Sequence, residues 1–184
     1  RDVLACAGSV TATRGNQNNE LGVPNTLLAA DADTLNVVVE MGMRGSGQID
    51  SLCSFVRPDW GIVTQVGESH IELLGSRENI ARAKSELIAA LPEGGIAFLN
   101  GADDMSDFVW DNAQGAERGV GAVCFDGSGA YREDAARGWR AGRAVWASDI
   151  SLDDAGCASF TLFARGFSDG AGCEKIGRAS CRER

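Results

Sequence analysis

Short apolar runs alternate with helix-like segments through the first two thirds of the chain, at a spacing of roughly 30 residues. The runs are TLNVVVEMG, GIVTQV, IAFLN and AVCFD, beginning at positions 34, 61, 96 and 122. Between them, apolar residues recur at helical spacing, at Ile49, Leu52, Cys53 and Val56 and again at Ile80, Ala83, Leu87 and Ile88. Strands that alternate with helices form parallel rather than hairpin-connected sheets. The pattern predicts an α/β domain with a mainly parallel sheet flanked by helices.

The rhythm changes at both ends of this region. From about Trp139 onward, AVWASDISLDDAGCASFTLFAR reads as strand, turn, strand, with DDAG as the connection. We expect a small antiparallel β extension there, either at the edge of the main sheet or as an added sheet. Near the start, residues 10–13 are a candidate short strand, followed by the turn-rich loop RGNQNNELGVP.

Composition limits the function classes. The chain has 184 residues, is 44% apolar and has a formal net charge of -9. Such a length suits one domain, and the negative charge disfavours nucleic acid and anionic membranes as partners. No apolar run reaches the roughly 18 residues that span a bilayer, and we expect no signal peptide. The six cysteines are scattered without a CxxC pair, so we expect reduced thiols and a cytoplasmic location.

The last ten residues, KIGRASCRER, break the local pattern and carry four of the 17 basic residues. We interpret residues 175–184 as a non-native tail that resembles translated adaptor sequence. The domain itself is then expected to span residues 1–174.

Polar residues follow three consecutive predicted strands. Glu40 ends the first, His70 follows the second, and Asn100 and Asp103 follow the third. Ligands bind at the carboxyl ends of parallel strands, so these residues form a candidate site. Each also has an ordinary alternative: a strand-end Glu or a helical lysine such as Lys84 is usually solvated, and a single His is usually structural. These residues contain no GxxxxGK[ST] phosphate loop.

Five stretches occur in a recognisable order: RGNQNNELGVPNTLL, VVVEMGMRGSGQI, RPDWGIVTQVGESHIELLGS, IARAKSEL and LNGADD. Together they resemble the central ATP-binding domain of the Mur ligase family, whose fold is similar to that of phosphate-loop nucleoside triphosphatases. The resemblance covers Thr11 to Asp104 strongly and Val120 to Ala164 weakly. The Asn-rich loop with Gly-Val-Pro is most similar to the member that joins D-alanyl-D-alanine to UDP-N-acetylmuramoyl-tripeptide.

The resemblance implies an amide ligase that uses ATP and Mg²⁺ and passes through an acyl phosphate. It implies that Glu40 binds Mg²⁺ near the ATP phosphates and that His70 binds a second Mg²⁺. Lys84 matches the lysine that the family carbamylates, which would make it an anion able to attract Mg²⁺. These three residues are therefore the implied catalytic and metal-binding residues.

The resemblance also implies a nucleotide site and a substrate site. Asn100 matches the family's asparagine near the adenine, and Asp103 an acidic neighbour. The UDP-muramoyl substrate would face a loop whose matching residues are Thr13, Asn16, Asn18 and Asn19.

The same resemblance predicts that the family's phosphate loop and its N- and C-terminal domains lie outside this chain. We therefore expect the chain alone to be nearly inert, and a sheet edge or apolar surface to be bare. The full-length enzyme is expected to be a monomer in the bacterial cytoplasm. Two alternatives stay open: another amide ligase of the superfamily, such as folylpolyglutamate synthase or another Mur ligase, and a non-catalytic nucleotide-binding domain.

Overall fold

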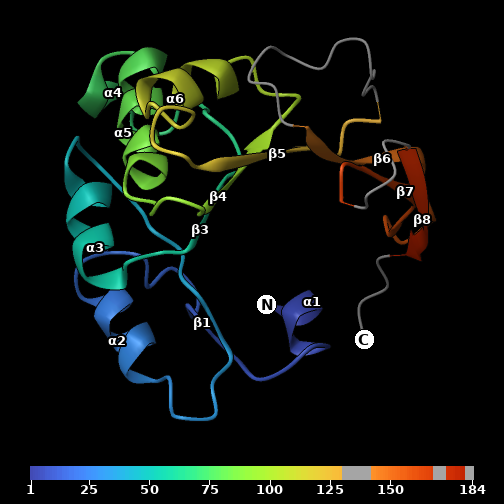
Figure 1. Cartoon of the computed structure of the whole chain (residues 1–184), viewed down its shortest axis with the longest axis horizontal. Helices are drawn as coiled ribbons and strands as arrows, with labels where there is room; N and C mark the ends of the chain where they lie inside the picture. The colour runs from blue at the N-terminus through green and yellow to red at the C-terminus, as the bar shows by residue number, and fades with distance from the viewer. Residues whose placement is uncertain (130–141, 168–172, 181–184) are drawn as a thin grey trace.

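The computed structural model describes residues 1–129, 142–167 and 173–180 (Figure 1). A six-stranded sheet has the order β3-β4-β5-β6-β7-β8, and a separate two-stranded parallel sheet pairs β1 with β2. The strands are β1 Val10–Ala12, β2 Asn36–Val38, β3 Trp60–Val63, β4 Ile96–Asn100, β5 Gly121–Asp126, β6 Arg143–Leu152, β7 Ala158–Arg165 and β8 Cys173–Ser180. The order confirms the predicted strand sequence and the α/β fold class.

Pairing is parallel from β3 to β6 and antiparallel from β6 to β8. The predicted antiparallel extension is therefore confirmed, as a continuation of the main sheet rather than an added sheet. Residues 175–180 of the predicted non-native tail lie in β8, and 181–184 are outside the described residues. Strand pairing at a sheet edge does not distinguish a native from a non-native segment, so the tail remains a prediction.

The helices in the described part of the chain are α1 Asp2–Ala5, α2 Gly22–Leu28, α3 Gln48–Val56, α4 Ile71–Leu74, α5 Arg77–Ala89 and α6 Ser106–Asn112. Figure 1 shows α4, α5 and α6 gathered together beside the strands. The two helices predicted from apolar spacing are confirmed: α3 precedes β3, and α5 precedes β4.

The main core lies between α5, α6 and one face of the sheet. Ile80 and Ile88 of α5 are at most 1% exposed, as are Ala97 and Leu99 of β4. Full burial of an aliphatic side chain of this size stabilises the fold by about 1.5–3 kcal/mol. These contacts fix the position of α5, the helix that carries Lys84.

Local signals set the ends of α5. Ser76 caps the helix by accepting a hydrogen bond from the backbone N–H of Asn79 at 3.2 Å. After the last turn the chain reverses at Gly94, whose φ of 78° is in the left-handed region where glycine is favoured. The turn returns the chain directly into β4, so helix and strand are placed side by side.

Two of the strands that form from these apolar runs are partly exposed. In β3, burial alternates: Gly61 and Val63 are buried, whereas Trp60 and Ile62 are each 58% exposed. In β2, Val37 is 42% exposed. The reason is position, because within the described residues β3 is the last strand of its sheet and β2 pairs only with β1. Apolar surface is thus exposed on both strands.

We predict a large loss of stability for one apolar residue of β4 and almost none for one of the neighbouring strand β3. Leu99→Ala should lower the free energy of unfolding of the chain by about 2–5 kcal/mol, because it leaves a cavity in the core. Ile62→Thr should change it by less than about 0.5 kcal/mol, because the side chain is mostly in solvent. Urea unfolding measures both, and equal losses would contradict the assignment of the two faces.

Candidate functional site

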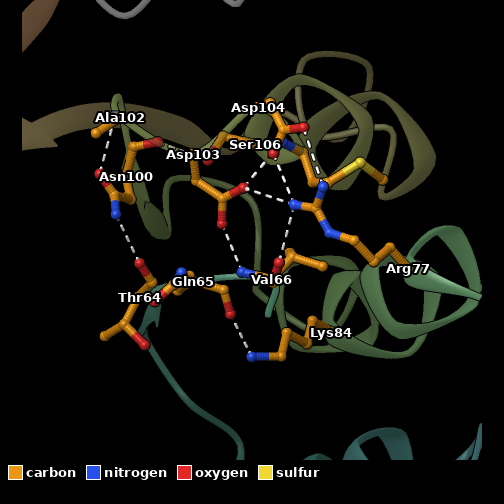
Figure 2. Close-up of polar contacts among 11 residues, drawn as sticks. Thr64, Gln65, Val66, Arg77, Lys84, Asn100, Ala102, Asp103, Asp104 and Ser106 are labelled. Atoms are coloured by element: carbon orange, nitrogen blue, oxygen red, sulfur yellow. Dashed lines mark hydrogen bonds and ion pairs between the residues drawn. The ribbon is translucent and has the colours of Figure 1, made fainter. Parts of the chain in front are cut away.

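The backbone just beyond β3 is held by side chains from three directions (Figure 2). The carbonyl groups of residues 64–66 each accept one side-chain hydrogen bond. Asn100 Nδ2 donates to the first at 2.9 Å, Lys84 Nζ donates to the second, and Arg77 donates to the third at 3.1 Å. These donors come from β4 and α5, so the carboxyl end of β3 is tied to both neighbouring elements.

A buried carboxylate completes this arrangement. Asp103 is 6% exposed and accepts hydrogen bonds from the backbone N–H groups of Val66 and Met105. Arg77 lies 3.9 Å from its Oδ1 atom. Asn100 Oδ1 accepts from the N–H of Ala102 at 2.9 Å. The two residues predicted to bind nucleotide therefore use their polar atoms to join β3 to the loop that leads into α6.

Arg77 is a residue that the sequence interpretation missed. It makes a two-pronged ion pair with Asp104, at 2.7 and 3.1 Å. The hydrogen bond from Arg77 holds the pKa of the Asp104 carboxyl below its usual value. A signal existed, because Arg77 is the first residue of α5, where the helix dipole disfavours a cation unless carboxylates lie nearby.

Lys84 lies at a hollow of about 230 Å³ beside the carboxyl end of β3. The hollow is lined by Thr64, Gln65, Gly67, Ser69, Ile80 and Lys84. Burial lowers the pKa of the Lys84 ammonium, and the charge of Asp103 opposes this effect. The amine is thus half-buried, oriented by one carbonyl, and more easily deprotonated than a solvated lysine.

His70 follows the same loop and is exposed. Its φ of 67° lies in the left-handed region, which is uncommon for residues other than glycine and costs on the order of 1–3 kcal/mol. Its carbonyl accepts from the N–H groups of Leu73 and Leu74, so His70 is the N-cap residue that precedes α4. This left-handed residue therefore lies at the junction between the loop after β3 and α4.

Glu40 belongs to a second polar group, beyond the ends of β1 and β2. Asn18 Nδ2 donates to Glu40 Oε1 at 2.8 Å, and the backbone N–H of Glu40 donates to Thr13 Oγ1 at 2.9 Å. The structure therefore brings the predicted metal-binding Glu40 together with Thr13 and Asn18, two residues predicted to face the substrate.

The other two predicted substrate residues differ from each other. Asn19 Oδ1 accepts from the N–H groups of Leu21 and Gly22, and so stabilises the start of α2. Asn16 is exposed in the turn before it.

The sequence interpretation expected Glu40, His70 and Asn100 to converge at one sheet edge. Strand pairing unites Asn100 and the loop to His70, because β3 and β4 are neighbours. It does not unite them with Glu40, because β2 lies in the other sheet. Backbone pairing alone therefore does not carry Glu40 to the carboxyl end of β3.

Mg²⁺ binding can be judged from the donor groups. Within the described residues, no three side chains of His, Cys, Asp or Glu are grouped to hold a metal ion. Mg²⁺ is commonly bound by one or two carboxylates, with water and phosphate oxygens completing its shell. The exposed Glu40 carboxylate fits this chemistry, whereas the imidazole of His70 is a less usual ligand.

Cys53 is buried, which makes it an unsuitable nucleophile. The pKa of the Cys53 thiol is raised to about 11, chiefly by burial. A thiol with such a pKa is nearly all protonated at neutral pH and is a poor nucleophile.

In the described part of the chain, no helix has the length and apolar character needed to cross a membrane.

A mainly parallel sheet with polar side chains beyond the carboxyl ends of its strands defines an α/β domain of the ligand-binding class. The Mur ligase middle domain matches residues 1–161, and the chain belongs to the Mur ligase family.

Proteins similar to this chain in sequence and in structure include ligases of one branch of this family. The UDP-N-acetylmuramoyl-tripeptide–D-alanyl-D-alanine ligase of Mycobacterium bovis is 38% identical over 162 residues, which are 88% of this chain and 28% of that protein. The crystal structure of MurF from Acinetobacter baumannii has a TM-score of 0.72 and 26% identity, covering 97% of this chain and 33% of that one. MurF from Thermotoga maritima in complex with ADP has a TM-score of 0.65 and 23% identity, covering 97% and 35%. The chain thus spans about a third or less of these proteins.

We predict that Asp103→Asn lowers the free energy of unfolding by about 1–3 kcal/mol. The amide replaces one carboxylate oxygen by an N–H₂ group, which faces a backbone N–H and leaves a buried donor unpaired. Asp104→Asn is the matched control and should cost at most about 1 kcal/mol, because Asp104 is exposed. Thermal or urea unfolding compares the two, and an equal effect would refute the role given to Asp103.

Proposed function

We propose that the full-length protein is an ATP-dependent amide ligase that adds D-alanyl-D-alanine to UDP-N-acetylmuramoyl-tripeptide during synthesis of the peptidoglycan precursor. The observation that carries the proposal is the 38% identity over 88% of the chain to a ligase of that name. ATP would phosphorylate the tripeptide carboxylate, and the amine of the dipeptide would displace phosphate from the acyl phosphate. The Thermotoga maritima relative is in complex with ADP, which supports nucleotide binding by the full-length protein.

Lys84 is proposed to act as a carbamate. A neutral amine attacks CO₂ and loses a proton, so burial that lowers the lysine pKa favours the reaction. The product retains one N–H, which can still donate to the carbonyl of Gln65. The new anionic group would then occupy the hollow beside Lys84, where an ammonium would repel a metal ion.

Glu40 and His70 are proposed to bind Mg²⁺, which when bound supplies positive charge to the phosphate oxygens. The exposed carboxylate of Glu40 is the harder and better-suited ligand. In this proposal His70 is held at the mouth of the site by its left-handed backbone and by the start of α4.

The remaining predicted residues are proposed to shape two binding surfaces. Asn100 and Asp103 hold the carboxyl end of β3 and the following loop beside the nucleotide. The loop predicted to face the substrate contains Thr13, Asn16, Asn18 and Asn19, and its exposed Asn16 is proposed to contact the substrate. The reaction needs positioning and neutralisation of charge more than a covalent nucleophile, so residues that fix the backbone contribute to it.

The family's other branches would use the same ATP-binding domain with a different amino donor.

We propose that the full-length enzyme acts as a cytoplasmic monomer on soluble substrates. This is in keeping with the acidic composition of the chain, which has a net charge of -9.

We predict that Lys84→Ala in the full-length protein lowers kcat by at least about 100-fold, because it removes an anion from the site. Phosphate release in the presence of the UDP-tripeptide, D-alanyl-D-alanine and ATP measures this. Glu78→Gln, an exposed change near the start of the same helix, is the control and should retain activity.

A second readout separates carbamylation from the overall reaction. With ¹³CO₂, the wild-type protein should show a carbamate carbon resonance that is absent in Lys84→Ala. Wild-type protein that releases phosphate without dependence on D-alanyl-D-alanine would contradict the proposed donor. Active wild-type protein without the resonance would contradict only the role of Lys84.

A further inference from the structure

We infer that Asn18 is a positioning residue for Glu40, fixing its carboxylate for the metal ion rather than contacting the UDP-muramoyl substrate. The inference rests on the proposed function, since it assigns how the Mg²⁺ ligand of that site is oriented. It changes the role expected for Asn18 from the resemblance alone.

Asn18 contacts the segment around Glu40 through both its side chain and its backbone. Its side-chain Nδ2 donates to Glu40 Oε1 at 2.8 Å, and its backbone carbonyl accepts from the N–H of Gly42 at 2.7 Å. A third contact comes from Thr13, whose Oγ1 accepts from the backbone N–H of Glu40. The Glu40 carboxylate, the Glu40 backbone and the backbone of Gly42 are thus all hydrogen-bonded to the segment that contains Thr13 and Asn18.

Packing at Gly42 independently supports the close approach of Asn18. A Cβ atom at position 42 would lie 2.9 Å from both Cγ and Oδ1 of Asn18. The φ of Gly42 is not in the left-handed region. A side chain at position 42 would therefore have to displace the Asn18 amide, although the backbone conformation there does not demand glycine.

The chemistry of the contact suits a metal ligand. A glutamate on an exposed strand end has several rotamers, and a hydrogen bond to one oxygen restricts them while leaving the other oxygen directed elsewhere. The partner is a neutral amide, so the carboxylate keeps its full charge, whereas Lys or Arg would compete with a cation. Partners of this kind orient metal ligands, and their loss commonly weakens metal binding by about 10–100-fold.

The test uses the full-length protein and Mn²⁺ as the metal, titrated in the presence of ADP and followed by electron paramagnetic resonance. Asn18→Leu removes the donor and keeps the number and branching of the side-chain heavy atoms. Gly42→Ala removes no polar group but displaces the Asn18 amide, and it decides the question if the first variant does not fold. We expect at least about 10-fold weaker Mn²⁺ binding for Asn18→Leu and a smaller loss in the same direction for Gly42→Ala.

Steady-state kinetics provide the contrast. Asn18→Leu should raise the Mg²⁺ concentration needed for half-maximal rate by a similar factor, with KM for the UDP-tripeptide changed less than about threefold. Asn16→Ala, in the same loop, should raise that KM and leave Mn²⁺ binding unchanged. Mn²⁺ binding within twofold of wild type in the folded variants would overturn the inference. An inactive wild-type protein would instead overturn the proposed function, so the two failures are distinguishable.

Discussion

The buried carboxylate of Asp103 is the interaction on which the rest of the site depends. It accepts from the backbone N–H groups of Val66 and Met105, and so fixes the exit of β3 against the start of α6. A buried carboxylate needs such donors, because desolvation without them is costly. With Val66 in place, the adjacent carbonyl of Gln65 is presented to Lys84, and the loop continues to His70. One side chain thus sets the geometry of the two groups proposed to do chemistry there.

The two polar clusters, one at the carboxyl end of β3 and one around Glu40, differ in the charge of the groups that surround their carboxylates. At the carboxyl end of β3, Arg77 neutralises the neighbouring carboxylates, and burial weakens the hold of Lys84 on its proton. Around Glu40 the partners are neutral, an amide from Asn18 and a hydroxyl from Thr13. The first arrangement is suited to holding backbone and modifying an amine, whereas the second preserves a full negative charge for a cation.

Sequence periodicity predicted the order of strands and helices well, because burial against α5 and α6 imposes it directly. It also predicted the helix that carries Lys84, which is α5 in the structure. It did not predict the exposure of Trp60 and Ile62, because whether a strand is central or at an edge depends on its neighbours, not on its own residues. Nor did it find Arg77 or the Asn18–Glu40 contact, since such pairings join residues 22 or more positions apart.

The most direct test of this account is a crystal structure of the full-length protein with a non-hydrolysable ATP analogue and Mg²⁺. The account predicts Mg²⁺ on Glu40, with Asn18 still bonded to the other carboxylate oxygen. It also predicts extra density of a carbamate on Lys84, whose remaining N–H still donates to the carbonyl of Gln65. An unmodified Lys84 ammonium pointing away from the nucleotide, with Mg²⁺ bound without Glu40, would contradict it.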